Sequence, residues 1–317
     1  CGLSWSARVA LVKSTVMSDD FRSTAAPETL VRRADLIRRT RAFFDSRGFV
    51  EVQTPLLSND TVIDRHLDPV PVQLPRSATE MNSGRPMFLQ TSPEFLMKRL
   101  LASGMQAIYQ ICPAFRVGES GQFHNPEFTM LEWYRCGDDY QAGMSLLSDF
   151  AAELLGRSPA RIQTVQELFA NQAGFNPYGA TAQELRQRCR QADIPVPESI
   201  REDDWDSWFE ILFGHFIQPQ LGQQQPEIVC DYPATQAALA RIRHQDSPVA
   251  ERFELFVDGI ELANGYHELL DADELRQRNE TVNRQRRMDG KQALPSESRL
   301  VKAMEAGLPS CSGTAVG

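Results

Sequence analysis

The residues best suited to chemistry lie in one stretch, 115–134, which reads FRVGESGQFHNPEFTMLEWY. A β-type run over 107–112 precedes it and a second extended run follows a polar loop, so we predict an antiparallel strand-loop-strand unit. Alternation along the second strand places four side chains on one face: Phe128, Met130, Glu132 and Tyr134. The loop adds Arg116, Glu119 and His124. This combination suits a ligand that is flat, charged and polar, and the alternative is an exposed hairpin with a chance charge pattern.

A second cluster, RFELFVDGIELANGYHEL, lies nearer the C-terminal end. Its Asp258-Gly259 dipeptide predicts a two-residue type I′ hairpin turn. That turn pairs Phe256 with Glu261 and leaves Glu254 on the same face, which puts the two carboxylates roughly 5 to 8 Å apart. Such a pair repels unless a proton or cation lies between, and carboxylates that bridge to phosphates suit Mg²⁺. The alternative is two exposed glutamates on a solvated strand.

The segment Thr91-Ser92-Pro93-Glu94 has the features of a helix start, with a hydroxyl cap and proline in the first turn. On its own it indicates a well-capped helix. We expect Lys98 and Arg99, further along this helix, to be solvated.

The string from Arg116 through Glu119 to HNPEFTMLEWY resembles motif 2 of the class II aminoacyl-tRNA synthetases, in the variant of the lysyl family. Within that family it is most similar to truncated paralogues that lysylate elongation factor P. The helix, glycine, strand and proline of 29–55 resemble motif 1, the homodimer interface of the family. The stretch 307–317, GLPSCSGTAVG, resembles the start of motif 3. In the motif 2 loop the family usually reads Arg-Asn-Glu-Glu, whereas this chain has glycine at 118, so we expect Glu119 to supply the missing contact.

The resemblance implies an α+β fold, the class II synthetase catalytic domain, in which helices flank an antiparallel sheet. It also implies ATP and Mg²⁺ as cofactors, with Phe128 on the adenine, Arg116 on the α-phosphate and catalysis by Arg116, Glu254 and Glu261. The implied ATP-binding residues are Arg116, Glu119, His124, Asn125, Phe128, Glu254, Glu261 and Gly317. The implied metal ligands are Glu254 and Glu261.

The same resemblance implies an amino acid pocket in which Glu94 contacts the amine at the reactive end and Glu268 holds the distal ammonium. The implied substrate-binding residues are Ser92, Glu94, Glu132, Tyr134, Asn264, Glu268 and Ala315. Strict alternation turns Asn264 and Glu268 away from Glu261, so this pocket requires a β-bulge, for which Gly265 is the natural place.

Composition limits the function classes. The chain has 317 residues with 42% hydrophobic and 24% charged content, which is ordinary for a globular protein with one large or two modest domains. A net charge of -9 argues against a broad basic surface for nucleic acid. The six cysteines are scattered without a CxxC pair, which predicts reduced thiols in a cytoplasmic protein. No apolar run approaches the roughly 20 residues that span a membrane.

We interpret residues 1–26 as a leader, with Met17 as the natural start and 1–16 as upstream sequence or a cloning remnant. Residues 27–317 then form the catalytic domain, cut within motif 3 and carrying a helical insertion at about 141–217. The span before motif 1 is too short for the OB-fold anticodon domain of a lysyl-tRNA synthetase, so we do not expect tRNA as the acceptor.

Position 315 agrees with that choice of acceptor. The synthetases have glycine where this chain has Ala315, and a methyl group there favours a β-amino acid such as (R)-β-lysine. We therefore expect a homodimeric, ATP-dependent ligase that joins (R)-β-lysine to a lysine ε-amino group of elongation factor P. Two alternatives stay open: a catalytic fragment of a lysyl-tRNA synthetase, or a nucleotide-binding pseudo-synthetase without the motif 3 arginine.

Overall fold

The computed structural model describes residues 23–75, 77, 84–244 and 246–317. Within them the main sheet has nine strands: β1 (Val50–Glu51), β5 (Ala107–Phe115), β6 (Glu127–Cys136), β12 (Cys311–Val316), β11 (Ile260–His267), β10 (Val249–Val257), β8 (Glu227–Pro233) and β7 (Arg161–Thr164) in that order, with β9 (Ile242–Arg243) paired to β10. Neighbours are antiparallel except at the two edges, where β1 pairs with β5 and β7 with β8 in parallel. The predicted α+β class is confirmed. The predicted leader, 1–26, lies outside the described residues except for 23–26.

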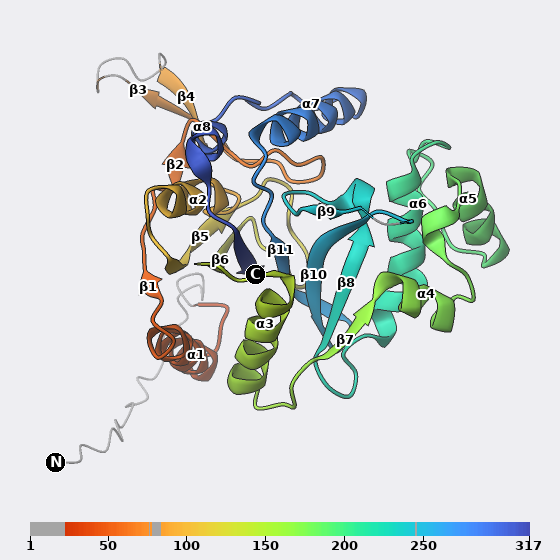
Figure 1. Ribbon diagram of the computed structural model, residues 1–317, viewed down its shortest axis with the longest axis horizontal. Helices are drawn as coiled ribbons and strands as arrows, with labels where there is room; N and C mark the ends of the chain where they lie inside the picture. Colours follow the sequence, from red (N-terminus) through yellow and green to blue (C-terminus); the bar gives the residue numbers. More distant parts are fainter. Residues whose placement is uncertain (1–22, 76, 78–83, 245) are drawn as a thin grey trace, which may run out of the picture.

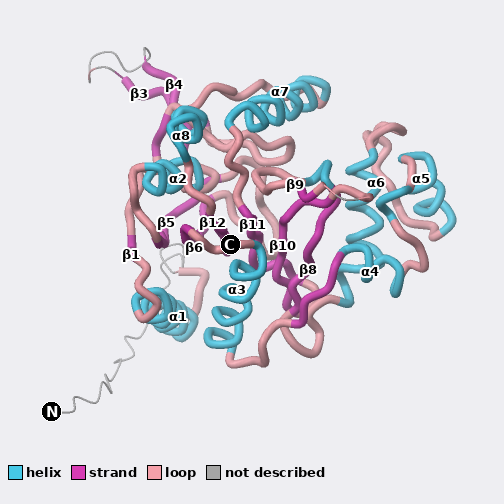
Figure 2. The backbone as a smooth tube through the Cα atoms, in the orientation of Figure 1, coloured by secondary structure: helices cyan, strands magenta, loops and turns pink. Residues whose placement is uncertain are grey.

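Helices cover both faces of this sheet and one of its ends (Figures 1 and 2). One face carries α1 (Pro27–Asp45) and α3 (Tyr140–Leu155), and the other carries α2 (Glu94–Ala102), α7 (Ala272–Met288) and α8 (Arg299–Gly307). At the β7 end lie α4 (Val165–Gln172), α5 (Ala182–Gln191) and α6 (Trp205–Leu212). A small sheet of β2 (Leu57–Ser58), β4 (Gly84–Leu89) and β3 (Pro71–Pro75) stands beside α2 and α8. In the described part of the chain, each helix is too short or too polar to cross a bilayer.

An aromatic core fixes α1 and α3 to the sheet. Phe44, at the C-terminal end of the predicted first helix, stacks on Tyr109 of β5 with ring centroids 4.8 Å apart and contacts Trp133 of β6 at 5.1 Å. Phe150 of α3 packs on the same Trp133 at 5.3 Å. Because Trp133 and Leu131 are buried here, the alternate residues of β6 must point to the opposite face, as predicted.

The span 141–217, where we expect a helical insertion, contains most of α3 and all of α4, α5 and α6. Thr181 and Glu184 form the capping box of α5, and the apolar stripe of α6 continues into a π-helical turn, η3 (Phe213–Ile217). Strand β7 interrupts this span and was not predicted.

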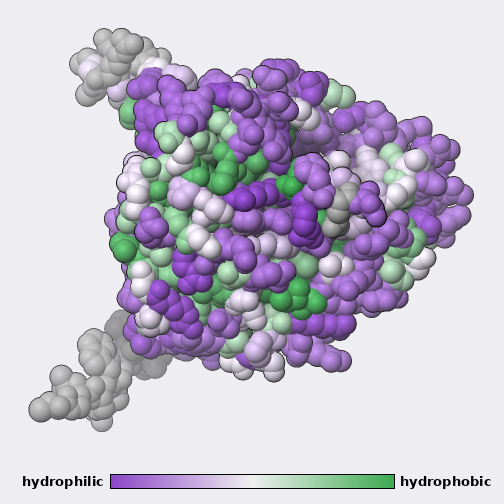
Figure 3. Space-filling model, in the orientation of Figure 1, coloured by the Kyte–Doolittle hydropathy of each residue, from purple (hydrophilic) through white to green (hydrophobic). Residues whose placement is uncertain are grey.

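Over α5 and α7 the face drawn in Figure 3 is mostly hydrophilic. The strand that we predict after the first helix, within 29–55, has only two residues, Val50 and Glu51 of β1, which pair with β5.

The hairpin of β10 and β11 has the predicted turn and a bulge at an unexpected place. Asp258 and Gly259 have φ angles of 53° and 78°, as a type I′ turn requires. Phe256 pairs with Glu261, but Leu255 pairs with Ala263, so the extra residue is Leu262. The expectation of a bulge at Gly265 is therefore wrong.

The glycine at 265 serves packing instead. A Cβ atom there would lie 2.3 Å from Cε2 of Phe253 and 2.8 Å from Oγ1 of Thr314. Gly265 therefore lets the ring of Phe253 lie against the strand. The bulge at Leu262 brings Glu261 and Asn264 onto one face of the sheet. We expected a bulge at Gly265 to have this effect.

Candidate active site

The face of β6 that carries Glu132 and Tyr134 lies toward helix α2. Glu132 contributes a fully buried carboxylate to this face. Glu132 is 1% exposed, and its two oxygens accept hydrogen bonds from Ser92 Oγ, at 2.9 Å, and from the Tyr134 hydroxyl. The Ser92 hydroxyl also accepts from the Glu94 amide at 3.0 Å. The N-cap residue of α2 is Pro93, which offers no side-chain cap, so the expectation of a hydroxyl cap is wrong. Burial and the nearby Glu94 carboxylate raise the pKa of Glu132 to about 8.

Lys98 lies in the centre of this network, which corrects the expectation that it is solvated. Its ammonium group is 2.5 Å from Glu94 Oε1, one helical turn earlier, and 2.5 Å from Glu268 Oε2. Lys98 and Glu268 are each 1% exposed, whereas Arg99 is half-buried. Burial alone lowers the pKa of Lys98, but the charges of Glu268 and Glu94 raise it above its ordinary value. Lys98 therefore stays protonated between the carboxylates of Glu94 and Glu268.

Strand β12 lies between the two strands β6 and β11 and pairs with both. Ala315 is paired with Glu132 on one side and with Asn264 on the other. Directly paired residues project from the same face of a sheet, so the Ala315 methyl group lies between those two polar side chains. This register brings together residues that the sequence predicted from three separate segments.

A glycine in the same strand allows a close approach. Gly313 pairs with Tyr134 and Tyr266. A Cβ atom on it would lie 2.2 Å from Cε1 of Tyr134 and 2.6 Å from Oε1 of Glu268. Only glycine leaves room for the phenol ring and the carboxylate at this point. Sequence reasoning did not identify Gly313.

The second acidic group lies on β10 and β11. Glu254, 4% exposed, accepts from the Tyr232 hydroxyl at 2.5 Å through one oxygen and pairs with Arg252 through the other. It is the direct cross-strand partner of Asn264. Glu261 is exposed as a residue, yet the protein atoms around its carboxylate and the charge of Glu254 raise its pKa. The two glutamates thus share one face, as predicted.

The motif 2 loop carries Arg116 to the edge of these carboxylates. Its guanidinium lies 5.0 Å from the ring centroid of Phe128, and it contacts Glu119 Oε1 and the Thr91 carbonyl at 3.4 Å each. Its positive charge lowers the pKa of Glu261. By the register of the sheet, Phe128 and Glu261 project from the same face as Glu132.

Three other predicted ATP-binding residues lie at the rim. His124 and Asn125 are exposed. The Gly317 amide donates to the Leu262 carbonyl at 3.3 Å, and a Cβ atom on Gly317 would lie 4.0 Å from Phe128. The structure thus brings Gly317 to the Phe128 ring and leaves the loop residues open to solvent.

Comparison with known proteins gives the family. Residues 13–317 match the family described as tRNA synthetases class II (D, K and N). The chain belongs to this family. Three relatives share the name "Elongation factor P--(R)-beta-lysine ligase". The Salmonella arizonae protein is 40% identical over 94% of this chain and 90% of its own length, and that of Edwardsiella ictaluri is 41% identical over 95% and 92%. The Pectobacterium atrosepticum protein is 41% identical over 94% and 90%.

The donor set of this class II chain fits Mg²⁺ held jointly with phosphates. In the described residues no group of three or more His, Cys, Asp and Glu side chains forms a complete metal cage. Glu254 and Glu261 offer two carboxylates whose mutual repulsion a cation relieves. Mg²⁺ takes one or two carboxylates and fills its remaining positions with phosphate oxygens and water.

Several buried polar atoms in this network are free to bind a polar ligand. Among the residues that the structure describes, Glu268 Oε1, Asn264 Oδ1 and Thr314 Oγ1 are buried and have no hydrogen-bond partner. Leaving such atoms without a partner is costly, and native proteins usually satisfy them. A ligand with hydrogen-bond donors, such as an ammonium group, can donate to the two acceptor oxygens, Glu268 Oε1 and Asn264 Oδ1.

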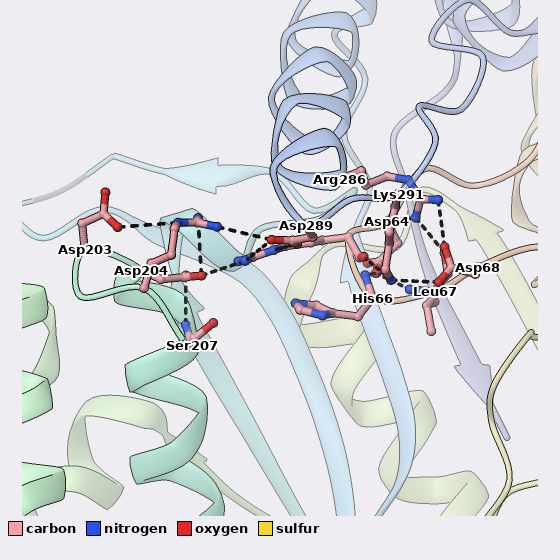
Figure 4. Close-up of polar contacts among 12 residues, drawn as sticks. Asp64, His66, Leu67, Asp68, Asp203, Asp204, Ser207, Arg286, Asp289 and Lys291 are labelled. Carbon is pink, nitrogen blue, oxygen red and sulfur yellow. Dashed lines mark hydrogen bonds and ion pairs between the residues drawn. The ribbon is translucent and has the colours of Figure 1, made fainter. Parts of the chain in front are cut away.

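A network outside the predicted residues positions the motif 2 loop (Figure 4). The Val117 amide donates to the Asp68 carbonyl at 2.8 Å. The Asp68 carboxylate in turn binds Arg286 and Lys291, both at 2.8 Å. Arg65, nearby in the same loop, binds Asp204, the N-cap residue of α6, and Asp289, which follows α7, at 2.7 Å each. Sequence reasoning missed this network, because its partners lie far apart in the chain.

Proposed function

We propose that the chain is an ATP-dependent ligase that activates (R)-β-lysine as an adenylate and transfers it to a lysine ε-amino group of elongation factor P. The observation that carries the proposal is the buried acidic pocket of Glu94, Glu132 and Glu268, which matches a substrate with two ammonium groups. The names of relatives at 40–41% identity over nearly the whole chain support the choice of substrate and acceptor. The free thiols of the described cysteines agree with a cytoplasmic site of reaction.

In this proposal ATP lies across the open part of the sheet. Phe128 stacks on the adenine, Arg116 binds the α-phosphate, and Glu119, His124, Asn125 and Gly317 line the nucleotide. Glu254 and Glu261 hold Mg²⁺, which neutralises phosphate charge when it is bound. The substrate carboxylate attacks the α-phosphorus and pyrophosphate leaves. Catalysis rests on position and charge, because no protein nucleophile is needed.

The amino acid binds in the pocket beside this space. Glu94 pairs with the amine nearer the carboxylate, and Glu268 with Asn264 holds the distal ammonium. Ser92 and Tyr134 keep Glu132 in place through the hydrogen bonds described above. An uncharged analogue leaves buried carboxylates without a partner, which gives strong discrimination.

Pyrophosphate exchange tests the proposal. The purified chain is assayed with ATP and either (R)-β-lysine or α-lysine, and labelled amino acid is then offered to elongation factor P and to tRNA(Lys). Exchange that favours β-lysine, with label on the protein, is the expected result. Preference for α-lysine with label on tRNA identifies a lysyl-tRNA synthetase catalytic unit instead. Absence of exchange with either amino acid indicates a nucleotide-binding pseudo-synthetase and overturns the proposal.

Ala315→Gly is expected to move the preference toward α-lysine. The methyl group lies between Glu132 and Asn264, and its removal makes room for a different placement of the amine. We expect the ratio of kcat/KM for β-lysine over α-lysine to fall about tenfold, the size of a one-methyl effect. Exchange rates with both amino acids measure it. An unchanged ratio contradicts the role of Ala315, and Ala303→Gly on α8 is the control for a methyl lost elsewhere.

The pH dependence of KM follows from the raised pKa values in the pocket. Burial raises the pKa of Glu268 and of Glu132 to about 8, so both are largely protonated at pH 6.5. An ammonium group pairs with the ionised form, so affinity improves as pH rises. We expect KM for β-lysine to fall roughly tenfold between pH 6.5 and 8.5. The KM for ATP serves as the internal control, and a flat KM for the amino acid contradicts the assignment.

We also propose a homodimer through motif 1. Apolar side chains are exposed on α1 and the edge strand β1: Leu30, Val31, Leu36 and Val50. Such a patch marks an interface in many proteins. Sedimentation velocity is expected to give a dimer for the native chain and a monomer for Val31→Asp, with Met288→Asp, an exposed residue on α7, as the dimeric control. A native monomer at micromolar concentration contradicts this proposal.

A further inference from the structure

The internal cation of the amino acid pocket is Lys98. Its ammonium lies 2.5 Å from the carboxylates of Glu94 and Glu268 and 5.8 Å from the ring centroid of Tyr134. The side chain is buried among the groups that the proposed function assigns to substrate binding. The ion pair with Glu94 has the i, i+4 spacing of an ordinary helix pair, but the burial and the second partner, Glu268, go beyond that.

The charges of the pocket leave an imbalance that fits one kind of ligand. Glu94, Glu132 and Glu268 bring three negative charges when ionised, and Lys98 brings one positive charge. Two negative charges are left without a cation. Buried charges without partners are costly, so protons or a dicationic ligand must compensate them.

We propose that Lys98 is a positioning residue that sets the charge of the pocket: by neutralising one of three carboxylates and holding Glu94 and Glu268 in place, it leaves two acidic positions for a substrate with two ammonium groups. This inference rests on the proposed function and deepens it. On this inference the pocket discriminates against amino acids with one ammonium group, because they leave a buried carboxylate without a cation.

The neighbours of Glu268 determine how Lys98 acts on it. Burial raises the pKa of Glu268, Lys98 and Arg241 lower it, and Glu94 raises it. The other titratable groups that feel the Glu268 charge are Tyr134, Tyr266 and Cys311. Lys98 also lowers the pKa of Glu132. Removal of the lysine therefore makes both acids hold their protons to higher pH, and a protonated carboxyl group does not attract an ammonium.

Lys98→Met tests the inference, because methionine keeps the unbranched shape and removes the charge. In pyrophosphate exchange we expect the KM for β-lysine at pH 7.5 to rise about 100-fold, with kcat changed much less. The acid limb of kcat/KM is expected to move up by about one to three pH units. Arg99→Met, a half-buried cation at the next position of α2, is the matched control and is expected to leave both quantities unchanged.

Chemical rescue separates charge from packing. Lys98→Ala leaves a space that propylammonium can enter, and we expect this cation to lower the KM for β-lysine at least tenfold, whereas tetramethylammonium, which cannot donate a hydrogen bond, has no effect. A purely structural role gives a loss of stability without the pH shift and without rescue, which overturns the inference.

The remaining outcomes are also decisive. A lower KM in Lys98→Met means that the lysine occupies the place of a substrate ammonium and competes with it, which overturns the inference in the opposite direction. If the native chain exchanges normally and Lys98→Met has the same KM and the same pH profile, this inference is overturned and the proposed function stands. A native chain without any exchange overturns the proposed function, and this inference with it.

Discussion

Glu268→Gln is expected to raise the KM for β-lysine about 100- to 1,000-fold in pyrophosphate exchange. Glutamine keeps the shape of the side chain but removes its charge, so the distal ammonium loses its counter-ion. The amide also adds an NH₂ donor beside the ammonium of Lys98, which lies 2.5 Å from Glu268 Oε2. Oε1 of Glu268 is buried and has no hydrogen-bond partner among the described residues, so it is free to accept from a ligand.

The control for this variant is Glu251→Gln on β10. Glu251 is also a partly buried carboxylate, paired with Arg243 at 3.2 Å and with His267 at 2.5 Å, but it lies outside the proposed pocket. We expect this control to affect thermal stability and to leave KM within about twofold. Equal KM values for Glu268→Gln and the native chain mean that the ammonium does not bind at Glu268.

The hairpin that carries Glu261 and Glu268 shows where local sequence reasoning succeeds and where it fails. The turn is predictable, because the Asp258-Gly259 dipeptide readily adopts the two positive φ angles that a type I′ turn needs. The bulge is predictable in kind but not in place. A glycine within a strand indicates either a bulge or a close approach of another group. Gly265 is of the second kind, because the ring of Phe253 lies where a Cβ atom would be.

The pairing of β12 and the burial of Lys98 depend on contacts that no local pattern contains. Strand β12 pairs with β6 and β11, so Ala315 meets Glu132 and Asn264 only once the whole sheet has formed. Lys98 follows Glu94 by four residues, a spacing typical of an exposed helix pair. Lys98 is buried because it also pairs with Glu268, which follows β11 and is distant in the chain. Resemblance to a family supplied the predicted binding residues, but the charge balance around Lys98 required the structure.

Arg116→Ala is expected to lower kcat for pyrophosphate exchange about 100- to 1,000-fold, as the loss of a donor to developing charge does in other enzymes. The hydrogen bonds of the guanidinium to Glu119 and to the Thr91 carbonyl are long, 3.4 Å each. Little is lost when it turns to a phosphate, so its binding energy is available for the transition state. Arg116→Lys keeps the charge without the planar fork, and we expect it to recover part of the rate.

Arg135→Ala on the same strand-loop-strand unit is a closely matched control for Arg116→Ala. Arg135 also pairs with an acid three residues later, Asp138 at 2.7 Å, and also lies over an aromatic ring, Phe49 at 5.5 Å. It differs in its place, since it lies at the far end of β6 from the motif 2 loop. If both alanine variants slow exchange equally, the effect is one of folding. If only Arg116→Ala does so while ATP still binds, the arginine acts on the phosphate as the bond to pyrophosphate breaks.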